Sequence, residues 1–137
     1  MAFTNQLTVR MYDTDAAGIL YFGSQFRLVH DTFEALLEHE NIDFNALLTT
    51  SPYSFVIAHA SSDYMSMLKI SDKVDVMLSI AKVGETSFTC EYELVKASGE
   101  VAGRAKTVHV CIDAKTKQKM ALPEELLEKL GRYKGRL

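Results

Sequence analysis

The stretch of this chain whose residue types are best suited to chemistry spans residues 13–22. It reads Asp13-Thr14-Asp15-Ala16-Ala17-Gly18-Ile19-Leu20-Tyr21-Phe22. A carboxylate in a turn that opens a helix can meet a substrate whose developing negative charge points at the helix N-terminus. Free backbone N–H groups and the helix dipole favour an anion there. The arrangement suits acyl transfer, in which an oxyanion forms beside a nucleophile or a base.

The same two aspartates also fit a purely structural role. Asp is common in turns and helix caps, because its carboxylate accepts hydrogen bonds from nearby backbone N–H groups. Ala16, Ala17 and Gly18 are small enough to admit a ligand, but small residues also simply make turns. Local chemistry therefore leaves both interpretations of Asp13 and Asp15 open.

Periodic patterns on both sides of this stretch indicate the elements that position it. Residues 7–11 alternate between apolar and polar side chains, which is typical of a half-buried strand, and we expect that strand near residues 6–12. The run that follows predicts a helix from about Gly23 to Glu40, with Ser24 as its N-cap. Its apolar face has helical spacing and consists of Phe26, Val29, Phe33, Leu36 and Leu37.

Strands dominate the rest of the chain. Apolar runs predict strands over four ranges: 54–67, 73–83, 86–97 and 101–113. Gly84-Glu85 and Ser98-Gly99-Glu100 are typical of tight hairpins, so we expect an antiparallel four-strand meander plus the first strand. One helix cannot cover both faces of such a sheet, and the uncovered face and edges should find a partner subunit.

Two shorter helical segments flank the strands. Residues 41–48 should form a helical turn capped by Asp43, and Ser51-Pro52 should end it. Pro123 suits the first turn of a C-terminal helix. One face of that helix should comprise Leu126, Leu127 and Leu130.

The composition of the whole chain bounds its class. A length of 137 residues, of which 47% are apolar, fits a single globular domain over residues 1–137. No run approaches the roughly 20 apolar residues of a membrane span, and we expect no secretory signal at the N-terminus. The net charge of −3 and the lack of a basic stripe argue against nucleic-acid binding.

Cysteine and histidine usage argues against disulfide and metal sites. Cys90 and Cys111 lie far apart in strand-like runs, which predicts buried, reduced thiols in a cytoplasmic protein. The chain has four histidines, which are His30, His39, His59 and His109. No two of them have the i, i+4 spacing of metal ligands on a helix, and no Cys-x-x-Cys occurs. We therefore expect neither a metal nor a cofactor.

Taken in order, these motifs resemble one known family of enzymes. A strand, then residues 13–21, then a long helix wrapped by an antiparallel sheet resembles the hotdog-fold thioesterases, and among them the 4-hydroxybenzoyl-CoA thioesterase branch. Further segments that match are 63–72, 86–88, 105–113 and 122–125, so the resemblance covers nearly the whole chain. It implies the α+β class, as a hotdog fold with one long central helix wrapped by a curved antiparallel sheet of about five strands.

The resemblance assigns roles to residues of the first motif. The catalytic carboxylate of the family is the second Asp, here Asp15, which acts either as the nucleophile that forms an acyl-enzyme anhydride or as the base for water. The backbone N–H that polarises the substrate carbonyl falls seven positions later, at Phe22. Gly18 keeps the turn open and Tyr21 contacts the substrate, while we interpret Asp13 as an organiser of the loop.

The chain departs from the branch at several points. Phe22-Gly23-Ser24-Gln25 stands where many members have a His-Ala-Asn-Tyr-like run, and Ser66-Met67 stands where many have a proline. The basic cluster that meets the nucleotide phosphates in the 4-hydroxybenzoyl enzyme is replaced by residues 82–86. Its phosphate contacts therefore do not transfer. The candidates that remain for the coenzyme A phosphates, each also plausible as a solvated surface charge, are Lys69, Lys73 and Arg104.

A narrower resemblance is to the 1,4-dihydroxy-2-naphthoyl-CoA hydrolases of phylloquinone and menaquinone synthesis. Tyr21-Phe22 followed by His30, the run His59-Ala60-Ser61 and residues 107–112 carry it. It implies that His30 and His59 bond a hydroxyl of the substrate, although each also fits as a histidine satisfied in the core or at a subunit contact. We interpret His109, in mid-strand, as structural.

The sequence therefore predicts an acyl-CoA thioesterase for an aromatic acyl group, assembled as a homodimer or homotetramer with its site at the subunit contact. Two alternatives stay open. One is a short- or medium-chain aliphatic acyl-CoA thioesterase, which a Leu- and Met-rich pocket without hydroxyl partners would favour. The other is a non-catalytic acyl-binding or scaffold module.

Overall fold

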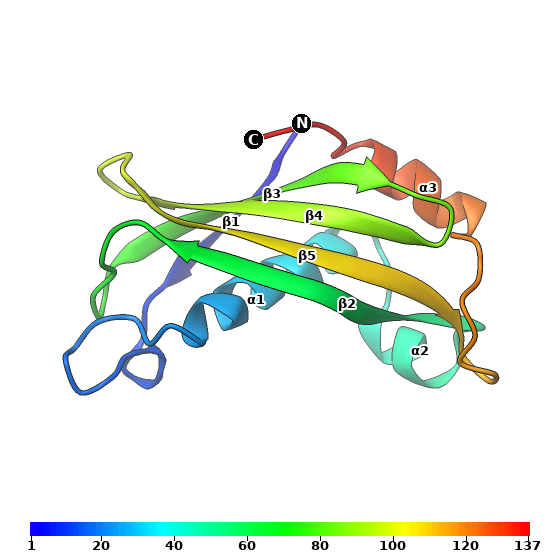
Figure 1. Ribbon diagram of the computed structural model, residues 1–137, viewed down its shortest axis with the longest axis horizontal. Coiled ribbons are helices and arrows are strands. Elements are labelled where there is room, and N and C mark those ends of the chain that lie inside the picture. Colours follow the sequence, from blue (N-terminus) through cyan, green and yellow to red (C-terminus); the bar gives the residue numbers. More distant parts are fainter.

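The computed structural model describes residues 1–137 and shows one curved antiparallel sheet wrapped around a long helix (Figure 1). The five strands have the spatial order β1-β3-β4-β5-β2. They are β1 (Phe3–Thr8), β2 (Tyr53–Tyr64), β3 (Lys73–Val83), β4 (Ser87–Lys96) and β5 (Val101–Asp113). The helices are α1 (Ser24–His39), α2 (Phe44–Thr49) and α3 (Glu124–Gly131). The predicted α+β class, with a long helix and a five-stranded sheet, is confirmed.

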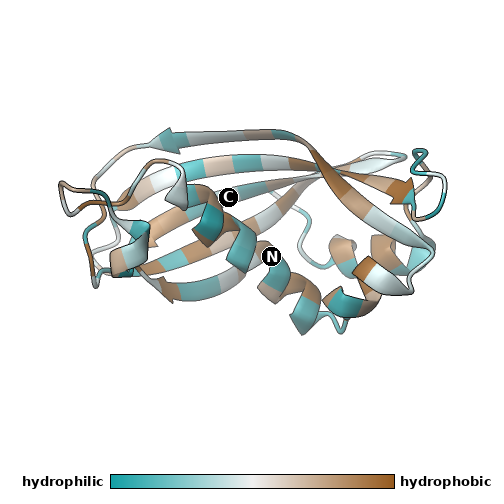
Figure 2. Ribbon diagram, turned by 90° about the horizontal axis from the view of Figure 1, so that it is seen from below, coloured by the Kyte–Doolittle hydropathy of each residue, from teal (hydrophilic) through white to brown (hydrophobic).

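The long helix α1 packs against the sheet because its apolar residues recur on one face. Val29, Phe33, Leu36 and Leu37 are each at most 3% exposed. Figure 2 shows α1 crossing the face of the sheet. The predicted cap is wrong: Gly23 is the N-cap, and no side chain caps the helix.

The predicted four-strand meander is wrong in one connection. β3, β4 and β5 follow one another as neighbours, but β2 pairs with β5 at the far edge of the sheet. The N–H groups of Met65 and Ser66 both donate to the carbonyl of Ala102. The regular hydrogen-bond ladder with β5 therefore ends here, and β2 ends at Tyr64 rather than at residue 67. Residues 65–72 then cross the end of the sheet to reach β3.

The first strand lies earlier than the predicted residues 6–12. Its register with β3 ends at Thr8, and the N–H of Arg10 donates to the carboxylate of Asp13 over 2.9 Å. Met11–Asp13 then form a 3₁₀ turn. A side-chain acceptor thus replaces the sheet ladder, which the alternation of residue types does not reveal.

The shorter segments largely follow their predictions. Asp43 caps α2 by accepting hydrogen bonds from the N–H groups of residues 45 and 46. In α3, Leu126 and Leu130 are buried, but the predicted third member of that face, Leu127, is 39% exposed. None of the three helices is long and apolar enough to cross a lipid bilayer.

Candidate active site

The loop that carries Asp15 is a tight, hydrogen-bonded turn. The N–H of Asp15 donates to the carbonyl of Ile19 over 3.0 Å, and the N–H of Gly18 donates to the carbonyl of Asp15 over 3.0 Å. The Oδ1 atom of Asp15 accepts from the N–H of Ala17 over 2.8 Å. The other carboxylate oxygen bonds no group of the protein, and Asp15 is exposed. The turn therefore fixes the carboxylate while leaving one oxygen free to react.

Gly18 closes this turn in a backbone conformation that other residues avoid. Its φ is +79°, and a Cβ atom at this position would meet nothing within 4 Å. Any residue with a side chain at this position is therefore strained by the backbone conformation alone, without a steric clash with a neighbour. We expect Gly18→Ala to lower the free energy of unfolding by about 1–2 kcal/mol, measured by urea denaturation. The same substitution at Gly131, which has neither a positive φ nor a close neighbour, should not destabilise the protein.

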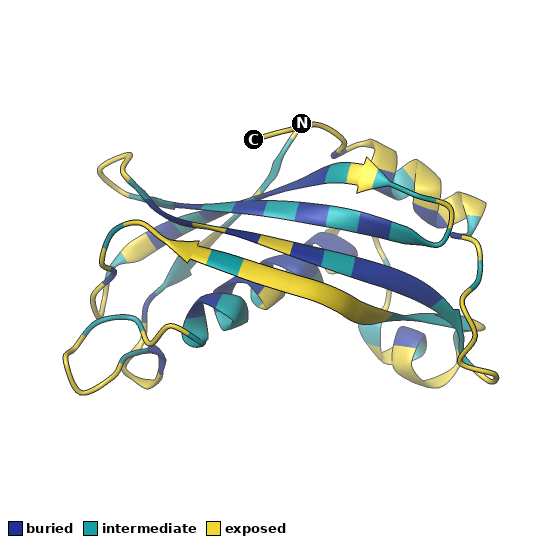
Figure 3. Ribbon diagram, in the orientation of Figure 1, coloured by how far each residue is buried: buried dark blue, intermediate teal, exposed yellow.

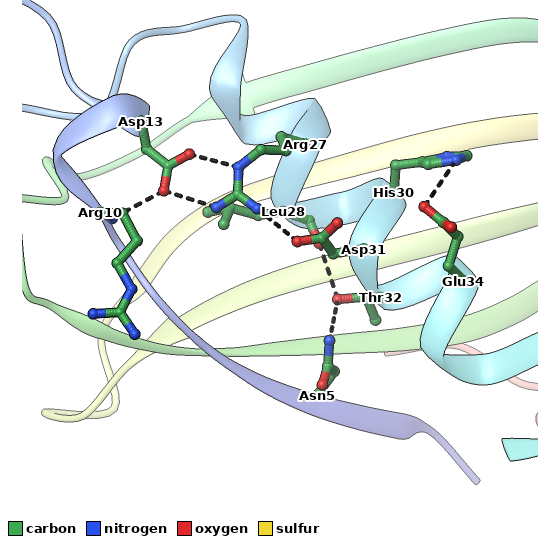
Figure 4. A network of polar contacts seen from close by, with 9 residues as sticks. All are labelled: Asn5, Arg10, Asp13, Arg27, Leu28, His30, Asp31, Thr32 and Glu34. Carbon is green, nitrogen blue, oxygen red and sulfur yellow. Dashed lines mark hydrogen bonds and ion pairs between the residues drawn. The ribbon is translucent and has the colours of Figure 1, made fainter. Parts of the chain in front are cut away.

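Asp13 ties the loop to α1, as Figure 4 shows. Its side chain is buried, and Arg27 pairs with both of its carboxylate oxygens, over 2.5 Å from Nε and 2.7 Å from Nη2. The hydrogen bond to Asp13 raises the pKa of Arg27. The third guanidinium nitrogen, Nη1, donates to Asp31 over 2.6 Å. Asp13 therefore organises the loop, as predicted, and its carboxylate is occupied by structural contacts.

The backbone of Asp13 also positions the peptide of Phe22. The Asp13 carbonyl accepts from the N–H of Tyr21 over 2.9 Å, and the Tyr21 carbonyl accepts from the N–H of Ser24 over 2.9 Å. The hydroxyl of Tyr64 donates to the carbonyl of Phe22 over 2.6 Å. The N–H of Phe22 has no acceptor in the protein, so a fixed backbone donor is available to a ligand.

Asp15 and Phe22 line the same cavity, which has a volume of about 400 Å³. It lies where the loop, the start of α1 and the segment after β2 meet. Its lining residues are Asp15, Ile19, Leu20, Phe22, Gln25, Tyr64, Met65, Ser66, Met67 and Leu68. Most of these are apolar, so the free oxygen of Asp15 and the free N–H of Phe22 stand out as its chemically competent groups. A carboxylate and an oxyanion donor beside an apolar pocket can hydrolyse an acyl group.

A hollow of similar size at the far end of α1 lacks this character. It measures about 500 Å³, and Glu34, Glu38 and Asp43 are among its lining residues. Ile42 and Phe44 are its only apolar lining residues. It offers an acyl group neither an apolar wall nor a fixed donor, and no group of three His, Cys, Asp or Glu side chains anywhere in the structure is arranged to hold a metal ion.

The predicted substrate contacts do not all reach the Asp15 cavity. Tyr21 is 46% exposed, and its ring lies 4.6 Å from that of Phe22 at a tilt of 42°, but Tyr21 is not among the residues that line the cavity. His30 lies in α1, 3.5 Å from the carboxylate of Glu34, and lines a different cavity. His59 is exposed on β2 in register with Val108, next to a bulge. The contacts predicted for these three residues stay predictions.

The three candidate phosphate ligands also separate in space. Lys69 follows the lining residue Leu68, and its backbone pairs with Ile19, so it adjoins the cavity. Lys73 donates to the hydroxyl of Thr8 over 2.8 Å. Arg104 pairs with Glu93 over 3.1 Å on the outer face of the sheet. Lys69 alone of the three therefore adjoins the cavity that holds Asp15.

Two residues of the site had no role in the sequence analysis. Tyr64 holds the Phe22 peptide, as described above. Gln25 is 1% exposed and donates to the hydroxyl of Ser62 over 2.6 Å and to the carbonyl of Asp63 over 3.0 Å. It fastens the start of α1 to β2. A polar residue on the apolar face of the helix was the signal for Gln25, whereas nothing in the sequence marks the bond of Tyr64.

Comparisons with known proteins identify relatives over most of the chain. Residues 9–130 match the family model of the thioesterase-like superfamily. The chain is 38% identical over 128 residues to a 1,4-dihydroxy-2-naphthoyl-CoA hydrolase of Nostoc punctiforme, covering 93% of this chain and 86% of the relative. A second such hydrolase, from Synechocystis, is 31% identical over 123 residues, covering 89% of each chain.

A solved structure extends the match to three dimensions. The crystal structure of a 1,4-dihydroxy-2-naphthoyl-CoA thioesterase from Synechocystis superposes with a TM-score of 0.90 at 29% identity and covers 96% of both chains. The predicted hotdog fold is therefore confirmed. With the family model spanning residues 9–130, the chain belongs to the thioesterase-like superfamily.

Proposed function

We propose that this protein hydrolyses an aromatic acyl-CoA thioester, with 1,4-dihydroxy-2-naphthoyl-CoA as its substrate. The observation that carries the proposal is that Asp15, with a free carboxylate oxygen, and Phe22, with a free backbone N–H, line one mainly apolar cavity. The names of the relatives that are 31–38% identical supply the acyl group. No cofactor enters the reaction.

In this mechanism the substrate carbonyl oxygen accepts a hydrogen bond from the N–H of Phe22. Asp15 then acts in one of two ways. It attacks the carbonyl carbon, which expels the thiolate of coenzyme A and leaves an anhydride for water to cleave, or it removes a proton from a water that attacks the carbonyl carbon and expels the same thiolate. The negative charge that develops on the carbonyl oxygen is stabilised by the fixed donor, which needs no reorganisation during the reaction. Gly18 and Tyr21 shape the approach to this cavity.

One observation favours a second candidate, an aliphatic acyl-CoA thioesterase. The cavity that holds Asp15 is lined by Leu20, Met65, Met67 and Leu68, and flexible thioether side chains accommodate many apolar shapes. The identity of the relatives outweighs this observation. His30 and His59 are proposed to bond the ring hydroxyls and would discriminate between the two classes.

A substrate panel tests the proposal. We expect kcat/KM for 1,4-dihydroxy-2-naphthoyl-CoA to exceed that for hexanoyl-CoA by at least about tenfold. A pocket that bonds a substrate hydroxyl disfavours analogues that lack it, because a buried polar group left unpaired costs about 1–3 kcal/mol. Equal turnover of both thioesters would transfer the assignment to the aliphatic class, and turnover of neither would favour a non-catalytic acyl-binding module.

The contact for the coenzyme A phosphates is chosen by its distance from the Asp15 cavity. Among the candidates, Lys69 adjoins the cavity and is proposed as the phosphate contact. Lys73 and Arg104 would serve only if a partner subunit carries the nucleotide toward them.

Cys90 and Cys111 are both free and buried, which supports a reducing compartment, and we propose the cytoplasm.

The edge of β2 supports assembly into a homodimer. Figure 3 shows β2 as an exposed strand at one edge of the sheet, and Val56 and Ile57 are 46% and 49% exposed. Its sequence, Tyr53–Tyr64, contains no proline, lysine or arginine, which are residues that block pairing at an edge. We propose that two copies join through β2, which brings the partner close to the Asp15 cavity at the end of this strand. A homotetramer would add a second contact through the uncovered outer face.

Sedimentation at micromolar concentration tests this assembly. We expect the wild-type protein to sediment at no less than twice its monomer mass of 15.3 kDa. Val56→Lys places a charge on both copies of the edge and should shift the protein towards monomer. Leu127→Lys on α3, an apolar position that is 39% exposed and lies away from this edge, is the matched control and should leave the mass unchanged. A wild-type monomer with full activity would contradict the proposal.

A further inference from the structure

A second cavity lies between α1 and the inner face of the sheet, and His30 is the only one of its lining residues to which the proposed function gives a role. It has a volume of about 290 Å³. Phe26, Val29 and His30 line it from α1, and Ile57 and Ala60 line it from β2. Most of these side chains are apolar. Since Ile57 and Ala60 belong to the exposed edge strand, the cavity lies beside that edge.

His109 is one of the polar lining residues and is held in one orientation. Its ring stacks on that of Phe33, at 4.1 Å and 15°, and lies nearly parallel to that of Phe88, at 5.1 Å and 9°. Its Nε2 atom lies 2.8 Å from the hydroxyl of Thr107, which lies 3.0 Å from the hydroxyl of Tyr92. Thr107 and Tyr92 also line the cavity. The imidazole is thus fixed by both aromatic stacking and hydrogen bonding.

The second ring nitrogen of His109 is unused. Nδ1 has no hydrogen-bond partner, although His109 is only 2% exposed. No side-chain nitrogen or oxygen that lacks a hydrogen-bond partner is fully sealed in this structure, so Nδ1 keeps some access to water, and His109 lines the cavity described above. Burial lowers the pKa of His109 to about 4, so the ring is neutral at neutral pH.

We propose that this cavity binds a planar apolar ring that carries a hydroxyl group, with the hydroxyl bonded to Nδ1 of His109. The apolar walls and the aromatic side chains suit a flat ring. A neutral imidazole offers one donor and one acceptor, and which of them faces the cavity depends on the direction of the bond to Thr107. A hydroxyl can donate a hydrogen bond to Nδ1 or accept one from it, so it can bond either tautomer of the imidazole. A carbonyl or an ether only accepts and an ammonium group only donates, so each of these can bond only one tautomer.

The position of the cavity relative to Asp15 leaves two sources for such a ring. On β2, Ala60 lines this cavity, Tyr64 lines the Asp15 cavity, and Ser62 between them is bonded to Gln25. The first residue of α1 that lines the cavity is Phe26, two residues after the start of the helix. At a rise of about 1.5 Å per residue, it lies about 3 Å along the helix axis from that start. The ring is either the acyl group of the substrate, an assignment that rests on the proposed function, or a separate ring compound.

Side-chain ¹⁵N NMR of the histidines tests the site without any turnover. Added 2-naphthol should shift the His109 Nδ1 resonance, whereas naphthalene, which lacks the hydroxyl, should leave the nitrogen unbonded. In His109→Phe, which keeps the stacked ring and removes both nitrogens, we expect 2-naphthol to bind about tenfold more weakly and naphthalene to bind as before. No response of His109 to 2-naphthol up to its solubility limit would overturn the proposal.

A second variant covers the case in which His109→Phe does not fold. Thr107→Val keeps the shape of the side chain and removes the hydroxyl that orients the imidazole. It should weaken the binding of 2-naphthol and spare that of naphthalene. Equal binding of 2-naphthol to the wild type and to Thr107→Val would contradict the orienting role and the proposal with it.

Kinetics on the same variants identify the source of the ring. If the ring is the acyl group, His109→Phe lowers kcat/KM for 1,4-dihydroxy-2-naphthoyl-CoA about tenfold more than for 2-naphthoyl-CoA. An unchanged ratio, with the NMR response intact, identifies a separate ring compound as the ligand. Absence of any thioesterase activity, with 2-naphthol still bound at His109, would overturn the proposed function and leave this site standing.

Discussion

Replacing Asp15 by asparagine should lower kcat/KM for the thioester by at least about 100-fold, the lower range for a positioned acid or base. The amide has nearly the shape of the carboxylate and keeps an oxygen that can accept from the N–H of Ala17, so the turn should persist. It loses the negative charge and the basicity that attack on a carbonyl requires. We therefore expect the free energy of unfolding to change by no more than about 0.5 kcal/mol. Steady-state kinetics and urea denaturation measure the two quantities.

Asp43→Asn is the matched control for this substitution. Asp43 also accepts hydrogen bonds from backbone N–H groups, at the N-cap of α2, but it lies outside the Asp15 cavity. Its variant should keep wild-type kcat/KM. Asp13→Asn should reduce activity less than Asp15→Asn, because the Asp13 carboxylate holds the loop and is buried away from the substrate. Activity of Asp15→Asn within a few-fold of the wild type would exclude Asp15 as the reacting group.

Arg27→Leu should destabilise the fold by about 3 kcal/mol, because it leaves a buried carboxylate without its cation. Asp13 is 1% exposed at its side chain, and Arg27 supplies both of its ion-pair contacts. The remaining donor to that carboxylate is the N–H of Arg10. Arg27 is itself 36% exposed, so water can reach the vacated position and the lower end of the range applies. Thermal and urea denaturation at neutral pH measure the loss.

Two further variants separate the buried pair from the surface pair of Arg27. Asp31→Asn removes the contact to Nη1, where both partners are more than a third exposed, and should cost no more than about 1 kcal/mol. Adding Asp13→Asn to Arg27→Leu removes the unpaired negative charge of the buried Asp13 carboxylate and should restore part of the stability. If the double variant is as unstable as the sum of the single variants, the ion pair does not account for the effect.

The predictions that succeeded rest on periodic patterns. The ranges 73–83 and 101–113 were predicted to the residue, because alternating apolar side chains end at clear hairpin turns. Helical spacing likewise predicted four buried residues of α1, which are Val29, Phe33, Leu36 and Leu37, whereas the fifth, Phe26, is only half-buried and the buried Leu28 was not predicted. Asp43 was identified as a cap because its side chain acts within its own turn. In each case the determining contacts are local in sequence.

The predictions that failed depend on contacts between distant residues. No local signal tells β2 to pair with β5 rather than with β3, because the bonds that end β2 join residues 65 and 66 to Ala102. The end of β1 is the exception, because it depends on a local contact, from the N–H of Arg10 to the side chain of Asp13 three residues later, which the alternation of residue types does not reveal. At the site, the sequence predicted Asp15 and the N–H of Phe22, but not the hydroxyl of Tyr64 that holds the Phe22 peptide from 42 residues away.

His109 illustrates the same limit for ligand contacts. The sequence places it in mid-strand, which is typical of a structural histidine, and its stacking and its bond to Thr107 agree with that interpretation. Its free Nδ1 becomes evident only when the cavity beside it is known. A residue can therefore be structural through one ring nitrogen and remain available to a ligand through the other.

The most direct test of the proposed active site is a crystal structure of Asp15→Asn with a non-hydrolysable thioether ketone analogue of 1,4-dihydroxy-2-naphthoyl-CoA. We predict the ketone oxygen about 3 Å from the N–H of Phe22, within the range of an oxyanion donor. We also predict the carbonyl carbon about 3–3.5 Å from the side chain at position 15, the separation of a reacting pair. A ketone oxygen bound to any other donor, with the position 15 side chain out of reach, would contradict the proposed active site.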